Sequence, residues 1–148
     1  MSPQNGLPQP GKAAKSGTPP TRCEIEEMLA QSAPSEVTAF LSRWLELETE
    51  LSQLHSQVCH VRETLGDKLL GNILVDRASQ MTSTLLRRAT DLARLPSCQA
   101  SDIGAKVYVL SRIEQFGAER SLYQEMCQSI LDDVKGLDIA VERFSRDD

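Results

Sequence analysis

Apolar residues recur at steps of three and four along residues 37–65, the clearest pattern in the chain. They are Val37, Phe40, Trp44, Leu47, Leu51, Leu54, Val58, Val61 and Leu65. This is the a/d spacing of a heptad repeat, held for about four heptads. The flanking positions, among them Arg43, Glu46, Glu48 and Glu50, are polar. The pattern predicts a long helix with a coiled-coil seam, and these nine positions are called the seam below.

Two further helical segments are predicted after the seam. Residues 73–95 carry apolar side chains on one side of a helix, and Pro96 ends that segment because proline has no backbone N–H to donate. Asp102 can cap a last helix over residues 102–144, whose apolar stripe is interrupted near Gly117. A rise of about 1.5 Å per residue makes this a rod of roughly 65 Å.

The N-terminal part of the chain differs from the rest. Residues 1–20 are rich in proline, glycine and polar residues, which predicts a disordered tail. Thr21 and Glu24 have the spacing of a capping box, and Ile25, Met28 and Leu29 follow on one helix face. We expect a short amphipathic helix over residues 21–33. It could dock into a partner's groove or fold back on the chain's own bundle.

The alternation typical of strands is absent, so the sequence predicts an all-α fold. We expect long antiparallel helices, as a helical hairpin or a three-helix bundle with coiled-coil heptads, over residues 35–145. Glycines and an asparagine at residues 66–72 mark either a turn or a kink in a continuous helix, and the sequence favours neither.

Charge and composition exclude several classes of function. The net charge is −5, and residues 1–22 contain three basic side chains and no acid, so the remainder carries −8. An acidic body argues against nucleic acid as a partner, since phosphate contacts need Lys and Arg. No apolar run reaches the roughly 20 residues of a transmembrane helix. The four cysteines have no C-x-x-C spacing, and we expect no leader peptide, so the sequence predicts free thiols. We therefore expect an intracellular, cytoplasmic protein, with cytoskeletal or nuclear location as alternatives.

Candidate chemistry is sparse. His55, Cys59 and His60 form the one cluster of reactive side chains, but a structural zinc ion needs four ligands. Cys59 and His60 are sequence neighbours, so they point about 100° apart on a helix and do not pair as nucleophile and base. We therefore predict no catalytic residue, no metal and no cofactor, and expect a protein that is not an enzyme.

The preferred hypothesis is a non-catalytic helical subunit or adaptor of a multi-protein coiled-coil assembly, of cytoskeletal, centrosomal, kinetochore or organelle-tethering type. It would bind other helical proteins through the seam; a homo-oligomer is a further possibility. The alternative is a self-contained regulatory module that docks a partner through its tail and short helix. Thr18, followed by Pro19 in the tail, is a candidate site for a proline-directed kinase.

Overall fold

The structure is a computed structural model that describes residues 19–147, with side chains described as far as residue 137. Over this range the elements are α2 (Arg22–Gln31), α3 (Glu36–His60), the π-helical turn η2 (Val61–Leu65), α4 (Lys68–Ala93), α5 (Ala100–Gln115) and α6 (Arg120–Asp147). No strand occurs among the described residues, so the all-α prediction is confirmed. The coiled-coil heptads stay a prediction, and most of the predicted tail lies outside the described residues.

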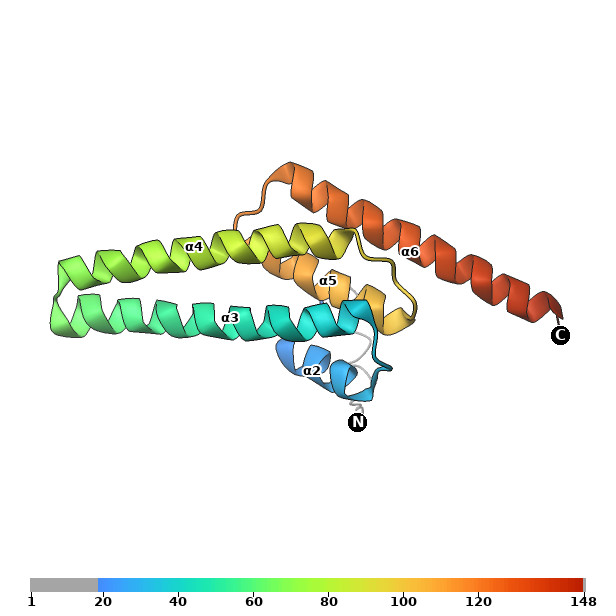
Figure 1. The fold of residues 1–148 in the computed structure, drawn as a ribbon, viewed down its shortest axis with the longest axis horizontal. Coiled ribbons are helices and arrows are strands. Elements are labelled where there is room, and N and C mark those ends of the chain that lie inside the picture. Colours follow the sequence, from blue (N-terminus) through green and yellow to red (C-terminus); the bar gives the residue numbers. More distant parts are fainter. Residues whose placement is uncertain (1–18, 148) are drawn as a thin grey trace, which may run out of the picture.

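The chain reverses direction between α3 and α4, which lie side by side along most of their length (Figure 1). Gly66 ends the first arm in the left-handed conformation, with φ 66°, which glycine adopts without a steric penalty. Asp67 caps the second arm, because its side chain accepts a hydrogen bond of 2.9 Å from the backbone N–H of Leu70. Residues 66–72 therefore contain a turn and not a kink.

Local capping fixes the starts of α2 and α3. The Thr21 hydroxyl accepts from the backbone N–H of Glu24, whose carboxylate accepts from the backbone N–H of Thr21. At the start of α3, the Ser35 hydroxyl accepts a 3.0 Å hydrogen bond from the backbone N–H of Thr38. Both are capping boxes, which satisfy N–H groups that the first helical turn leaves without partners.

The prediction of one long last helix is wrong. Gly117 has φ 79°, which ends α5 after Gln115, and the backbone N–H of Ala118 donates back to the Ile113 carbonyl at 3.0 Å. A new helix, α6, begins at Arg120 and runs across α4 and α5 to extend past the end of the helical body (Figure 1). The apolar stripe was interrupted near Gly117 because the chain turns there.

The predicted cap at Asp102 is also wrong. Gln99 is the N-cap of α5, and Asp102 is fully buried three positions into the helix. Its carboxylate accepts from the backbone N–H of Cys98 and from the Ser35 hydroxyl, both at 2.8 Å. From within the first turn, the side chain therefore satisfies a backbone N–H just before α5 and joins the start of α5 to the start of α3.

The core lies where α3, α4 and α5 meet. Trp44 is fully buried there, and its indole N–H donates a 3.1 Å hydrogen bond to the Leu85 carbonyl. The rings of Tyr108 and Phe116 pack around it at centroid distances of 6.3 and 6.2 Å. Because α3 contacts both α4 and α5, its buried face is wider than an a/d stripe and also includes Leu41 and Leu45.

Candidate functional site

The seam lies largely inside the chain. Six of its residues are buried (Val37, Trp44, Leu47, Leu51, Leu54 and Val61), while Phe40 and Val58 are half-buried. Leu65, at the end of η2, is the exception, with 61% of its surface exposed. Helices α4 and α5 supply the contacts that the sequence pattern assigned to partner helices. The role of the seam in binding other proteins stays a prediction.

The short helix α2 packs on its own chain. Ile25 is 1% exposed and belongs to the main core, and Met28 and Leu29 pack half-buried against it. A β-carbon at Gly104 of α5 would lie 3.0 Å from the Met28 sulfur, so the Met28 side chain packs against the backbone of α5 at that glycine. The sequence left open whether this helix docks into a partner's groove or folds back on the chain's own bundle. In the structure it folds back on the bundle. Thr18 lies outside the described residues.

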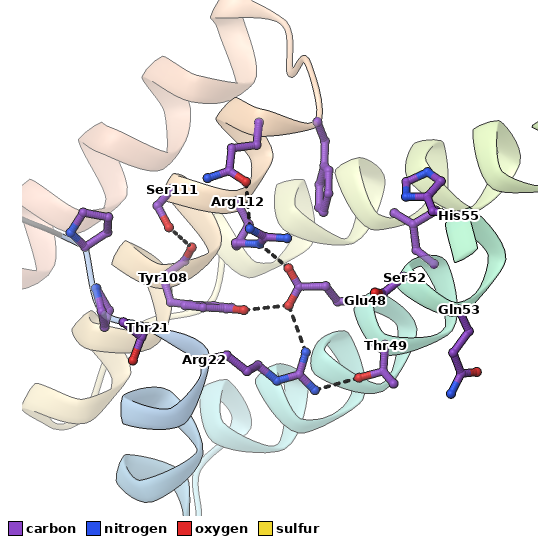
Figure 2. A pocket seen from close by; sticks show the side chains of 15 residues that line it. Thr21, Arg22, Glu48, Thr49, Ser52, Gln53, His55, Tyr108, Ser111 and Arg112 are labelled. Carbon is purple, nitrogen blue, oxygen red and sulfur yellow. Dashed lines mark hydrogen bonds and ion pairs between the residues drawn. The ribbon is translucent and has the colours of Figure 1, made fainter. Parts of the chain in front are cut away.

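A buried carboxylate, Glu48, is the centre of a polar cluster between α2, α3 and α5 (Figure 2). The Glu48 side chain is 6% exposed. One of its oxygens accepts from the Tyr108 hydroxyl at 2.6 Å and from the Arg22 guanidinium at 3.2 Å. The other accepts from Nε of Arg112. The prediction that Glu48 lies on a solvated flank is wrong, because α5 and α2 cover this side of α3.

A cavity of about 570 Å³ opens beside this cluster, lined by both arginines, Pro19 and Phe116 among others (Figure 2). Arg22 also donates to the Thr49 hydroxyl at 2.7 Å and to the Leu45 carbonyl at 3.3 Å. Burial, and then the hydrogen bond to Glu48, raise the pKa of Tyr108 above its ordinary value.

Both oxygens of Glu48 accept hydrogen bonds from cations or from the Tyr108 hydroxyl, so the carboxylate is held as an acceptor. A general base needs a carboxylate oxygen within reach of a substrate proton. The geometry therefore favours a structural clamp over an acid–base site. Sequence reasoning missed the cluster because Arg22 lies 26 positions before Glu48 and the α5 partners lie 60 or more positions after it.

A buried cation, Lys106 of α5, is hydrogen-bonded to the middle of α6. Lys106 is 0% exposed, and its ammonium group donates to the Leu95 carbonyl (2.6 Å), the Ser129 hydroxyl (2.8 Å) and the Asp133 carboxylate (2.6 Å). These acceptors account for all three N–H groups of the lysine. The position of α6 on α5 is thus set by a polar contact as well as by the buried Met126.

Two groups of large apolar side chains remain exposed. The first, called the tip surface, surrounds the α3–α4 turn and consists of Leu65 (61% exposed), Leu69 (74%), Leu70 (40%) and Ile73 (56%). The second, called the α6 surface, consists of Tyr123 (36%), Leu131 (54%) and Val134 (40%). The turn and the far end of α6 lie at opposite ends of the elongated molecule (Figure 1).

The remaining reactive side chains are dispersed. His55, Cys59 and His60 are all exposed on α3, and none of the four cysteines forms a disulfide. Among the residues that the structure describes, no group of three His, Cys, Asp or Glu side chains could hold a metal ion. Over the same residues, no helix combines the length and apolar character needed to cross a membrane.

No protein-family model, no curated protein and no solved structure matches this chain. Evidence about function therefore comes from the residues and surfaces described above.

Proposed function

We propose that this protein is a non-catalytic helical subunit or adaptor of a multi-protein coiled-coil assembly, of cytoskeletal, centrosomal, kinetochore or organelle-tethering type. One observation carries the proposal: large apolar side chains are exposed in two separate groups, the tip surface at the α3–α4 turn and the α6 surface on the first half of α6. A protein with two separate contact surfaces is suited to join other chains.

Hydrophobic area supports this assignment. Burying a Leu, Ile or Val side chain fully stabilises a complex by roughly 1.5–3 kcal/mol relative to leaving it in water. Contiguous exposed apolar patches on a protein surface commonly mark sites of protein–protein contact. Leu131 and Val134 of the α6 surface lie three residues apart, on one face of the helix. That spacing is what a partner helix packs against.

The proposed contact surface differs from the one that the sequence pattern suggested. Seam residues such as Leu51 and Leu54 are buried against the chain's own helices, so their use by a partner would require the hairpin to open. The exposed surfaces need no such rearrangement. We therefore assign partner binding to the α6 surface and the tip surface, and assign the seam up to Val61 to the stability of the chain itself.

The internal position of the seam also favours one part of the alternative function, a self-contained regulatory module. In that alternative the tail and α2 bind the partner. Ile25 would then have to leave the core, since it is 1% exposed. Binding through the tail alone would leave Ile25 in the core. Deleting residues 2–18 tests this possibility, because the deletion removes the tail and leaves the α6 surface intact.

Co-purification from cells with the tagged full chain tests the proposal. The double variant Leu131→Asp/Val134→Asp should lose helical partner proteins while keeping its helicity and melting temperature. Ser121→Asp/Gln124→Asp is the matched control, because it places the same two charges, also three residues apart, at exposed polar positions of α6. Unchanged partners in a variant with both the α6 surface and the tip surface substituted would refute the proposal. Loss of partners only on deletion of residues 2–18 would favour the regulatory module.

A further inference from the structure

We propose that the tip surface binds the tip of a second copy of this chain, so that two molecules associate through their α3–α4 turns. The inference rests on the proposed function, in which the tip is one of two contact surfaces, and it names the occupant of that surface. The α6 surfaces of both copies then remain available for other proteins.

The tip carries both a protrusion and a hollow. Leu69 and Leu65 are the two most exposed large apolar residues among those described, at 74% and 61%. A hollow of about 430 Å³ lies between the end of α3 and the start of α4, lined by Val61, Leu70 and Leu74 and by the polar Ser56, Gln57 and His60. A two-fold contact brings the same patch of both partners together, so one patch must supply both complementary shapes. Within the same few turns of helix, the tip has two exposed leucines, Leu65 and Leu69, and a hollow whose lining includes Val61, Leu70 and Leu74.

The charge distribution favours a second copy at this end of the molecule. Residues 60–77 contain three basic side chains (Arg62, Lys68 and Arg77) and three acidic ones (Glu63, Asp67 and Asp76), whereas the chain after residue 22 carries −8. Two copies that approach through residues 23–50, which hold seven acidic side chains and one basic one, therefore repel one another. At the tip, the charges of each copy sum to zero and both signs are present. A neutral surface also lacks the charge by which an acidic or basic partner would be selected.

The size of the surface sets the strength of the association. Stable interfaces bury about 800 Å² on each partner. Four aliphatic side chains, each exposed by 40–74%, form the apolar centre of a smaller contact. We therefore expect a reversible, concentration-dependent dimer with a dissociation constant on the order of micromolar, at the weak end of the range for specific complexes.

Analytical ultracentrifugation of the full chain over a concentration series tests the inference. The wild type should pass from monomer to dimer. The double variant Leu69→Asp/Ile73→Asp should weaken self-association at least a hundredfold, because each copy then places two carboxylates in the contact. Both residues are exposed, so helicity and melting temperature should not change. Ser79→Asp/Ser83→Asp is the matched control: it adds the same two charges, also four residues apart, at exposed positions of α4 roughly 15–20 Å along the helix from Leu69.

The outcomes separate this inference from the proposed function. A wild type that remains monomeric at several hundred micromolar overturns the inference, as does a dimer that survives Leu69→Asp/Ile73→Asp. In either case capture of helical partners through the α6 surface would still support the proposed function. Conversely, a tip-dependent dimer that captures no partner supports the inference and counts against the adaptor. Leu131→Asp/Val134→Asp should leave the self-association constant unchanged, and loss of the dimer in that variant would also overturn the inference.

Discussion

Replacing Glu48 by glutamine tests whether the buried polar cluster holds α2, α3 and α5 together. The substitution keeps the size of the side chain and removes its charge. A glutamine amide has one acceptor oxygen and a donor NH₂ group, whereas the carboxylate accepts from Arg22, Tyr108 and Arg112 with both oxygens. At least one of these donors therefore loses its acceptor, Arg112 loses its counter-charge, and Arg22 keeps only its 3.5 Å ion pair with the exposed Glu26.

The expected loss of stability follows from burial. Removing one member of a fully buried ion pair costs about 3–5 kcal/mol. The two arginine side chains are 36% and 32% exposed, so water screens part of that loss. Tyr108 is 3% exposed, and its hydrogen bond to a charged acceptor is worth about 1.5–3 kcal/mol. We expect Glu48→Gln to lower the free energy of unfolding by about 3 kcal/mol, and the melting temperature by roughly 10 °C for a chain of this length.

Urea unfolding followed by fluorescence measures this loss directly. Trp44 is the only tryptophan, and its ring lies 6.3 Å from that of Tyr108, so its emission reports on packing beside the cluster. Glu46→Gln is the control, because Glu46 is 65% exposed in its ion pair with Arg43 and should change stability by less than about 0.5 kcal/mol. If Glu48→Gln is no more destabilising than this control, the cluster does not hold the helices together and our reasoning is wrong.

Three further predictions concern pH, α6 and the glycines. Because burial raises the pKa of Tyr108 above its ordinary value of 10.0, the unfolded chain releases this proton first as pH rises. Stability should therefore fall above about pH 10, and less steeply in Tyr108→Phe, as urea midpoints at several pH values would show. Lys106→Met leaves the carboxylate of Asp133, 14% exposed, without its cation, and should cost about 3 kcal/mol and speed proteolysis within α6. Gly117→Ala should destabilise the protein by about 1 kcal/mol, because Gly117 has φ 79°. Gly136→Ala should stabilise it by up to about 1 kcal/mol, because Gly136 is helical and a β-carbon there would have no atom within 4 Å. Thermal unfolding of both variants measures the sign of each change.

Local features of the sequence predicted α2, α3 and α4, but not the division of the last segment into α5 and α6. Period and capping are short-range properties, so Thr21, Ser35 and the apolar positions of α3 and α4 specify helix starts and buried faces within a few residues. The turn at Gly66 was visible as a break, but its conformation was not. A glycine is compatible with a kink as well as with a left-handed cap, and the contact between α3 and α4 decides between them.

The candidate surfaces were much less predictable. An a/d stripe predicts that one face of a helix is buried. It does not indicate whether helices of the same chain or of another chain bury that face. The sequence determined that α3 has an apolar face. Only the tertiary structure decided that α4 and α5 cover it, which leaves Leu69, Ile73 and Leu131 exposed instead. The same holds for Glu48, whose polar side chain predicted a solvated position. Its burial depends on donors 26 to 64 positions away in the chain, brought together by the packing of three helices.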